Sequence, residues 1–238
     1  MATKKLHTSV HVGALTYDVD LPAGTIAVKV DPDADRTTVR VSTIDDIGQA
    51  ADMVTGATFT ETAGRLTVRL PKPPAVTHVN GGSISVIQNL GIVTGSVTGV
   101  VIDRFGNVQA GGGTAIVGAV APIVVEVTVP PGSGLVAAGQ SCDVIAVGQL
   151  HTAWVNTMSG NVHLDAVFAP EVKSMSGDIR VGHLTGDGRF STMSGDIHVN
   201  AAAPVNVRAS SMSGDVTVTG PAATVHARSM SGRVRTRD

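Results

Sequence analysis

A short motif, Met-Ser-Gly, recurs five times in the second half of this 238-residue chain, and three copies continue with Asp. Successive methionines are 17, 18, 19 and 18 residues apart: Met158, Met175, Met193, Met212 and Met230. A degenerate copy, Ser141-Cys142-Asp143-Val144, precedes them at a similar interval and makes six units from residue 135 onward. A fixed period of this length is typical of a solenoid, in which each repeat buries its apolar face against its neighbours.

Apolar and polar residues alternate on both sides of each motif copy, which indicates short β-strands. Four columns are predicted to face inward: Val155, Val172, Phe190, Ala209 and Ala227; Thr157, Ser174, Thr192, Ser211 and Ser229; Val162, Ile179, Ile197, Val216 and Val234; and Leu164, Val181, Val199, Val218 and Thr236. One column is predicted to face outward: His163, Arg180, His198, Thr217 and Arg235. We therefore expect an all-β fold, a parallel β-solenoid (β-helix) of about six 18-residue coils behind an N-terminal β-rich cap.

The motif is predicted to form the corner of each coil. Glycine accommodates a positive φ, so we expect the turn glycines to be Gly160, Gly177, Gly195, Gly214 and Gly232. The residue after Gly, most often Asp, is expected to cap its own turn by accepting a hydrogen bond from a nearby backbone N–H. By alternation the methionine column points outward, which makes a candidate contact stripe of Met158, Met175, Met193, Met212 and Met230.

The stacked carboxylates of Asp178, Asp196 and Asp215 are the candidate metal ligands, because Ca²⁺ prefers oxygen ligands. The chain lacks the G-G-x-G-x-D motif of calcium-binding β-rolls, so we favour turn capping and predict no metal and no cofactor. No Walker loop, H-E-x-x-H or paired-cysteine motif is present, and we predict no catalytic residue. Cys142, the single cysteine, is expected to be a structural thiol.

Three regions are expected along the chain. Residues 1–74 form an N-terminal β-rich region, with a short helix at 45–54 and a hairpin at 57–71 that turns at Ala63-Gly64. Residues 75–121 form a Gly-rich insert, with a hairpin that turns at Phe105-Gly106-Asn107. Residues 122–238 form the repeats.

Charge and composition exclude several classes of function. The net charge of −2 and the 3 % of aromatic residues do not indicate a nucleic-acid partner, and the arginines of the last repeat are interpreted as solvated. Residues 79–102 carry no charge and have G-x-x-x-G spacing, but their polar and β-branched residues favour strands over a transmembrane helix. No apolar segment follows the N-terminal lysines, so we expect a cytoplasmic protein, with cell-envelope association left open.

The "SGDI" and "SGDV" units after "VEVTVPPGS", together with "YDVDLPAGTIAVKVDPDADRTTVRV" near the N-terminus, resemble the DUF4097 family of bacterial β-strand-repeat proteins. The resemblance covers about residues 10–71 and 120–238, and the Gly-rich residues 75–119 depart from it. It implies a β-solenoid and an adhesin-like or scaffold role. It implies no catalytic residues.

A non-enzymatic binding or scaffold protein is therefore the leading hypothesis, with an unidentified protein or surface ligand as its partner. One alternative is a polysaccharide-acting enzyme of the parallel β-helix type, which would need a cleft built by residues 75–119. Another is a membrane-tethered surface module that uses residues 79–102. The final coil exposes a strand edge, so we expect either a monomer protected by Arg233, Arg235 and Arg237 or an end-to-end homo-oligomer.

Overall fold

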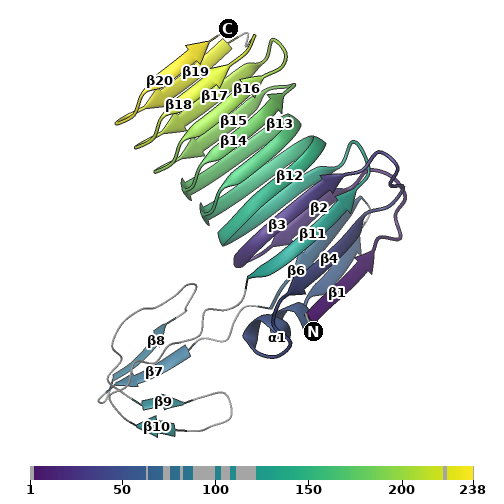
Figure 1. Cartoon of the computed structure of the whole chain (residues 1–238), viewed down its shortest axis with the longest axis vertical. Coiled ribbons are helices and arrows are strands. Elements are labelled where there is room, and N and C mark those ends of the chain that lie inside the picture. Colours follow the sequence, from purple (N-terminus) through teal and green to yellow (C-terminus); the bar gives the residue numbers. More distant parts are fainter. Residues whose placement is uncertain are drawn as a thin grey trace. The chain divides into compact units, whose positions relative to one another are not determined.

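The computed structural model describes residues 3–62, 64–71, 76–80, 83–87, 100–102, 108–110, 122–221 and 224–237. Within these ranges the regular elements are strands apart from one short helix, α1 (Gln49–Thr55), as Figure 1 shows. The all-β prediction is thus confirmed, and the helix lies a few residues later than expected. The chain divides into two compact units, residues 1–71 with 122–238 and residues 72–121.

The larger unit is built from sixteen of the described strands. Those before residue 72 are β1 (Thr3–Thr8), β2 (Thr16–Asp20), β3 (Ala23–Val30), β4 (Thr38–Thr43), β5 (Thr58–Thr62) and β6 (Arg65–Arg69). Those after residue 121 are β11 (Ile123–Val129), β12 (Gly134–Ser159), β13 (Val162–Ser176), β14 (Ile179–Leu184), β15 (Gly188–Thr192), β16 (Ile197–Ala201), β17 (Asn206–Ser211), β18 (Val216–Thr219), β19 (Thr224–Ser229) and β20 (Val234–Arg237).

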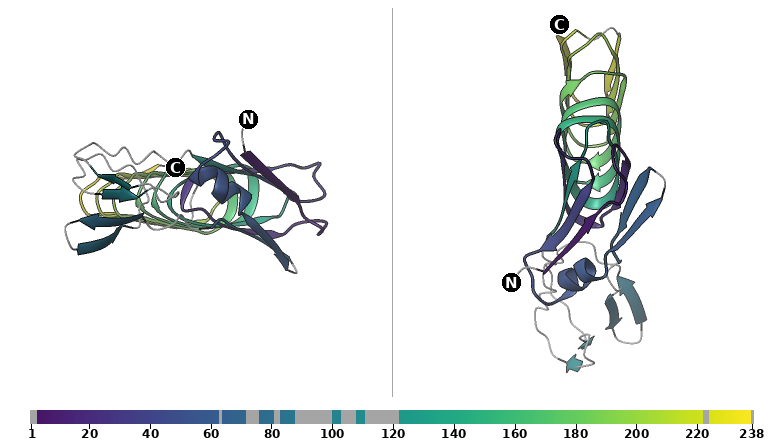
Figure 2. Two further views of the ribbon diagram at one scale, coloured as in Figure 1. Left: turned by 90° about the horizontal axis from the view of Figure 1, so that it is seen from below. Right: turned by 90° about the vertical axis from the view of Figure 1, so that its right-hand side faces the viewer.

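Equivalent residues of successive repeats pair with one another in two parallel ladders. In the first, β12, β13, β14, β16, β18 and β20 pair in that order, which aligns Val144, Val162, Ile179, Ile197, Val216 and Val234. In the second, β12, β13, β15, β17 and β19 align Val155, Val172, Phe190, Ala209 and Ala227. β12 and β13 take part in both ladders, which lie on opposite sides of the repeat stack (Figure 2).

The predicted inward columns form the core between the two ladders. Val172, Ile179 and Val216 are fully buried, and Phe190 is only 2 % exposed. The last repeat differs, because Val234 is 43 % exposed and Thr236 is also exposed. Both residues are register partners of the buried Val216 and Val218 and share their face, and they are exposed because their strand, β20, pairs on one side only among the described strands.

The N-terminal strands continue both ladders. β3 pairs in parallel with β12, and β11 lies between β3 and β4, parallel to the first and antiparallel to the second. β1 then pairs antiparallel with β4. In the other ladder β2 pairs with β12 and with β6, and the predicted hairpin of β5 and β6 is present. Residues 1–71 and the repeats therefore share one sheet.

The smaller unit contains β7 (Val76–Asn80), β8 (Ser83–Ile87), β9 (Val100–Ile102) and β10 (Val108–Ala110). β9 pairs antiparallel with β10, as the predicted hairpin requires, although its turn residues 105–107 lie outside the described residues. The G-x-x-x-G glycines at 91, 95 and 99 also lie outside them. No helix in the described part of the chain is long and apolar enough to cross a membrane.

Candidate functional site

The corner glycines are required for a reason other than the predicted one. Among the five, only Gly160 has a positive φ, of 141°. A Cβ on Gly195 would instead overlap the backbone carbonyl oxygen of Gly177, and a Cβ on Gly214 would overlap that of Gly195. The prediction of a positive φ at Gly195 is therefore wrong, and the column exists because successive corners contact each other backbone to backbone.

Small hydroxyl side chains satisfy the corner carbonyls from inside the stack. Thr192 Oγ1 donates to the carbonyl of Gly177 (3.4 Å) and Ser211 Oγ donates to that of Gly195 (3.1 Å). Ser229 Oγ donates to Gly214 in the same way (2.8 Å). A hydroxyl at this inward position therefore joins each of these repeats to the one before it.

Each Asp of the corner column caps the neighbouring repeat. The prediction that it caps its own turn is therefore wrong. Asp178 Oδ1 accepts a hydrogen bond from the backbone N–H of Asp196 (3.0 Å), and Asp215 Oδ1 accepts one from Arg233 (2.8 Å). Among the described residues, no group of three or more His, Cys, Asp or Glu could hold a metal ion. The column thus has a structural use, and nothing in the described part indicates a calcium site.

The methionine column is exposed along the whole repeat stack. Exposure is 44–49 % for Met158, Met175, Met193 and Met212 and 78 % for Met230. Cys142, in contrast, is buried with its thiol toward Thr157, and burial raises the pKa of the thiol. The cysteine is placed as a structural thiol would be, and the contact role of the methionines stays a prediction.

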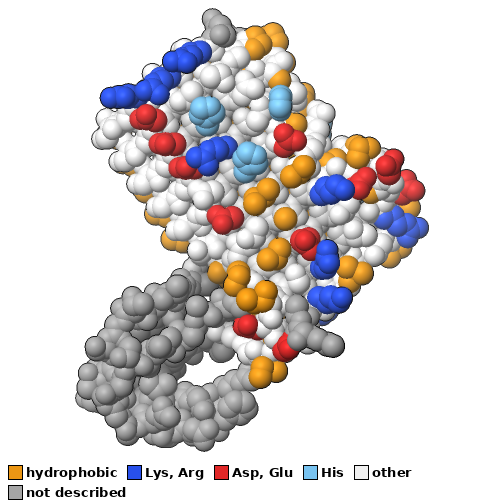
Figure 3. Space-filling view, viewed as in Figure 1, with side chains coloured by type: hydrophobic (Ala, Val, Ile, Leu, Met, Phe, Trp, Pro, Cys, Tyr) orange, Lys and Arg blue, Asp and Glu red, His pale blue; other side chains and the backbone are white. Residues whose placement is uncertain are grey.

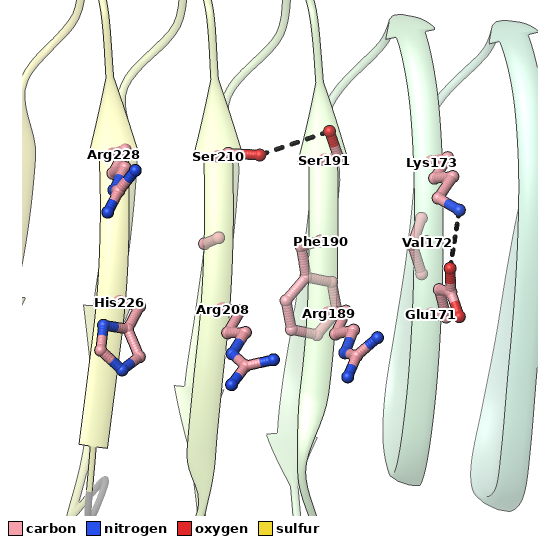
Figure 4. Close-up of a pocket in the computed structure, with 11 residues that line it drawn as sticks. Glu171, Val172, Lys173, Arg189, Phe190, Ser191, Arg208, Ser210, His226 and Arg228 are labelled. Atoms are coloured by element: carbon pink, nitrogen blue, oxygen red, sulfur yellow. Dashed lines mark hydrogen bonds and ion pairs between the residues drawn. The ribbon is translucent and has the colours of Figure 1, made fainter.

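The second ladder carries a feature that the sequence analysis missed, a shallow groove of about 530 Å³ across β13, β15, β17 and β19. Two rows of outward side chains form its walls (Figure 4). One row is Glu171, Arg189, Arg208 and His226, and the other is Lys173, Ser191, Ser210 and Arg228. Val172, Phe190 and Ala209 lie between the rows. We call this feature the cationic groove.

The positive charges of the groove are mostly uncompensated. Glu171 forms an ion pair with Lys173 (2.7 Å), and the hydrogen bond and charge of Lys173, with a smaller contribution from the charge of Arg189, lower the pKa of the carboxyl. Among the described residues, no acidic side chain forms an ion pair with Arg189, Arg208 or Arg228. At the edge of the first ladder, charges of both signs are mixed, because Arg180 forms an ion pair with the corner residue Asp178 (3.0 Å).

Figure 3 shows such mixing on one face, where acidic side chains lie beside basic ones near the C-terminal strands. In the groove, by contrast, Arg189 and Arg208 are register partners on adjacent strands. Adjacent strands lie about 4.8 Å apart, and like charges placed opposite each other destabilise a sheet. Asp187 is near enough for Arg208 to contribute to its lowered pKa, but hydrogen bonds from Asn206 are the larger cause. Arg189 and Arg208 therefore do not stabilise each other, although Glu171, the register partner of Arg189 on β13, places one negative charge at the end of the row.

Residues 106–238 match the Toastrack DUF4097 family model, a segment that contains the repeats and the cationic groove. The chain belongs to the DUF4097 (Toastrack) family. The resemblance seen in the sequence is thereby confirmed, and the corner columns described above are features of a Toastrack chain.

Similar solved structures include a proposed adhesin from Bacteroides fragilis (14 % identity, 98 % of this chain and 96 % of that chain covered, TM-score 0.43). They also include a proposed adhesin from Parabacteroides distasonis (12 % identity, 100 % of this chain and 97 % of that chain covered, TM-score 0.38). A proposed lipid-binding protein from the same species is a third example (9 % identity, 99 % of this chain and 97 % of that chain covered, TM-score 0.37). At TM-scores below 0.5, these likenesses do not define a ligand for the present Toastrack chain. No curated protein matches it.

Proposed function

We propose that this Toastrack chain is a non-enzymatic, adhesin-like binding protein that uses the cationic groove as its contact site. The observation that carries the proposal is the set of three arginines, Arg189, Arg208 and Arg228, which line an open groove and form no ion pair with an acidic side chain in the described part of the chain. An anionic ligand would neutralise these charges, and exposed arginines are well suited to bind carboxylate, sulfate or phosphate groups.

The scaffold in this proposal is a parallel β-solenoid of about six coils. It is supported by the two parallel ladders and by the hydrogen bonds that join each corner to the next. Each coil contacts its neighbours at many points, as in other repeat proteins, so the outward side chains hold a fixed spacing. The spacing of the charged residues is preorganised for binding, because little backbone order has to be created.

The methionine column extends the proposed contact face. Met175 and Met193 follow Lys173 and Ser191 by two residues, so alternation places them on the outward side next to the groove. Methionine is flexible and polarisable, which suits it to irregular apolar surfaces. We assign to these side chains the apolar part of the contact, at one margin of the groove.

A polysaccharide-acting enzyme is less well supported. Glycoside hydrolases typically use two carboxyl groups, one of them with a raised pKa. The described lining of the groove holds a single carboxyl, Glu171, whose pKa is lowered by Lys173. The arrangement favours holding an anion over cleaving a glycosidic bond.

A matched pair of triple variants tests the contact site. Arg189→Ser/Arg208→Ser/Arg228→Ser removes three charges from the groove, and Arg180→Ser/Arg233→Ser/Arg235→Ser removes three from the first ladder. We expect the groove triple to elute from a dextran sulfate column at clearly lower salt than the control triple. If both triples elute at the same salt concentration, only net charge matters and the groove is not the contact site.

A surface ligand also requires that the protein reach the cell envelope. Of the two localisations left open by the sequence, the proposal therefore implies cell-envelope association. Fractionation of the native cells tests this, with recovery in the envelope fraction as the expected result. Recovery in the cytoplasmic fraction alone would count against an adhesin-like role.

A further inference from the structure

The charges of the cationic groove are arranged in a line, and this constrains the shape of any ligand. Glu171, Arg189, Arg208 and His226 are register partners on four neighbouring strands. The row therefore runs across the strands for three strand spacings, or about 14 Å. A small anion would meet only one or two of these side chains. A ligand that uses the whole row has to be extended and to carry several negative charges.

The groove also offers partners for hydroxyl groups. Ser191 and Ser210 lie between the charged ends of the second row, and their hydroxyl oxygens are 3.3 Å apart (Figure 4). A serine hydroxyl both donates and accepts hydrogen bonds, and the carboxylate of Glu171 accepts them. These groups suit a ligand in which hydroxyl and anionic groups alternate.

An apolar platform lies at the β12 end of the first row. Trp154 is the register partner of Glu171 and is 38 % exposed. The flat face of an indole ring is an apolar surface on which the C–H face of a sugar ring can pack, and its N–H is free to meet a polar group. Along the first row, an apolar group (Trp154), a hydrogen-bond acceptor (Glu171) and two cations (Arg189 and Arg208) thus follow one another.

We propose that the groove binds an acidic polysaccharide of the polyuronate type, which lies across β13, β15, β17 and β19 with its carboxylates on Arg189, Arg208 and Arg228. A sugar ring at the β12 end packs against Trp154. This inference rests on the proposed binding function and names the ligand class of the same site.

The groove is less suited to single-stranded nucleic acid. Sites of that kind interleave cations with aromatic side chains on which successive bases stack. Here the aromatic residue between the rows, Phe190, is 2 % exposed, and Trp154 lies on β12 at the end of the row, so aromatic rings do not alternate with the arginines. An anionic membrane is less suited for another reason. The exposed methionines, which are the apolar side chains available to enter a bilayer, lie along one margin of the groove only.

The single tryptophan of the chain makes the inference directly measurable, because Trp154 reports on the groove by its fluorescence. The full chain is titrated with polygalacturonate, with neutral dextran, with a single-stranded DNA oligonucleotide and with phosphatidylglycerol vesicles, at one fixed ionic strength. We expect polygalacturonate to change the emission and to saturate. We expect dextran to have no effect, and the DNA and the vesicles to bind at least tenfold more weakly than polygalacturonate.

Variants then assign the binding to the proposed residues. Arg189→Ser/Arg208→Ser should weaken polygalacturonate binding at least tenfold, whereas Arg180→Ser on the first ladder should change it less than twofold. Trp154→Ala, measured by calorimetry, should weaken it several-fold. Melting curves establish that each variant is folded.

Three outcomes would overturn the inference. Tighter binding of DNA or of vesicles would assign the groove to another ligand class while leaving the proposed binding function intact. No binding of polygalacturonate would also overturn it, and the dextran sulfate comparison would still decide the proposed function separately. An equal loss in Arg189→Ser/Arg208→Ser and in Arg180→Ser would show that the polysaccharide does not use the groove.

Discussion

Asp196 Oδ1 accepts a hydrogen bond of 2.8 Å from the backbone N–H of Asp215, the residue at the same corner of the next repeat. The backbone carbonyl of Asp215 in turn accepts a hydrogen bond from the N–H of Ile197 (2.9 Å). Each corner is therefore tied to the next in both directions. The Ser-Gly-Asp motif recurs because it is the contact between repeats.

Replacement of Asp196 tests this contact. Asp196→Ala leaves the N–H of Asp215 to water, and we expect a loss of about 0.5–1 kcal/mol, as for an exposed hydrogen bond. Asp196→Asn should keep most of the stability, because Asn161 already accepts the same bond from Asp178 (3.0 Å). Urea denaturation of the two variants measures the difference. Equal losses in both would contradict the capping role.

Gly195 distinguishes a steric requirement from a conformational one. Gly195→Ala places a Cβ on the carbonyl of Gly177, and we expect it to destabilise the protein by about 1–3 kcal/mol, as overpacking does. Gly195→Asn should be at least as harmful, because the larger side chain meets the same backbone.

Gly13 serves as the control for this pair. It has φ +98° and open space around it, so Gly13→Asn should be tolerated far better than Gly195→Asn. Melting temperatures of the variants provide the comparison. If Gly195→Asn is tolerated better than Gly195→Ala, the corner would have to adopt a positive φ after all.

Ile197 tests the inward columns. It is 1 % exposed and lies between its register partners Ile179 and Val216. Ile197→Ala should cost about 2–4 kcal/mol, because it removes buried methyl groups and leaves a cavity. The neighbouring His198 points outward, so His198→Ala should change stability by less than about 0.5 kcal/mol. If Ile197→Ala and His198→Ala have similar denaturation midpoints, the assignment of Ile197 to the inward face and His198 to the outward face would be wrong.

The hydrogen bonds of Glu61, in the N-terminal part of the chain, predict that the stability of the fold depends on pH. Its carboxylate accepts hydrogen bonds from the N–H of Val10 (3.0 Å), from Ser9 Oγ (2.8 Å) and from the N–H of His11 (2.8 Å). The bond from Val10 is the largest cause that lowers the pKa of this carboxyl from its ordinary value of 4.5. Because the folded pKa is depressed, the stabilisation is present above pH 4.5 and is lost as the pH falls through the folded value.

Glu61→Gln isolates this effect. The variant should melt below the wild type at neutral pH, and the gap should close as the pH falls well below 4.5. Thermal melts from pH 7 to pH 3 measure the gap. A gap that stays constant over this range would mean that the charge of Glu61 does not stabilise the fold.

Alternation was enough to predict the buried columns, because it is a property of the local chain geometry. The reasons for Gly195 and Asp196 could not be predicted in the same way. A corner glycine serves equally for a positive φ or for a close backbone contact, and a corner Asp can cap its own turn or the next one. The choice depends on how the repeats stack. The insertion of β11 between β3 and β4 likewise depends on pairing across about 90 residues, which no local pattern indicates.

The cationic groove was missed although a signal for it exists. The residues four places before each Met should face outward by the same alternation, and they are Trp154, Glu171, Arg189, Arg208 and His226. These residues differ in type, so they do not form a repeated motif. Only the register of β13, β15, β17 and β19 shows that Arg189 and Arg208 are direct neighbours and that Arg228 lies on the next strand but one from Arg189.

The melting temperature with and without dextran sulfate tests most directly whether the groove arginines serve binding and not stability. Without the polyanion, the variant Arg189→Ser/Arg208→Ser/Arg228→Ser should melt at or above the wild type, because like charges on adjacent strands are removed. With the polyanion, the wild type and the variant Arg180→Ser/Arg233→Ser/Arg235→Ser should gain stability and the groove variant should not. Two results would contradict this account. One is a groove variant that melts well below the wild type in the absence of dextran sulfate. The other is a groove variant whose melting temperature rises as much as that of the wild type when dextran sulfate is added.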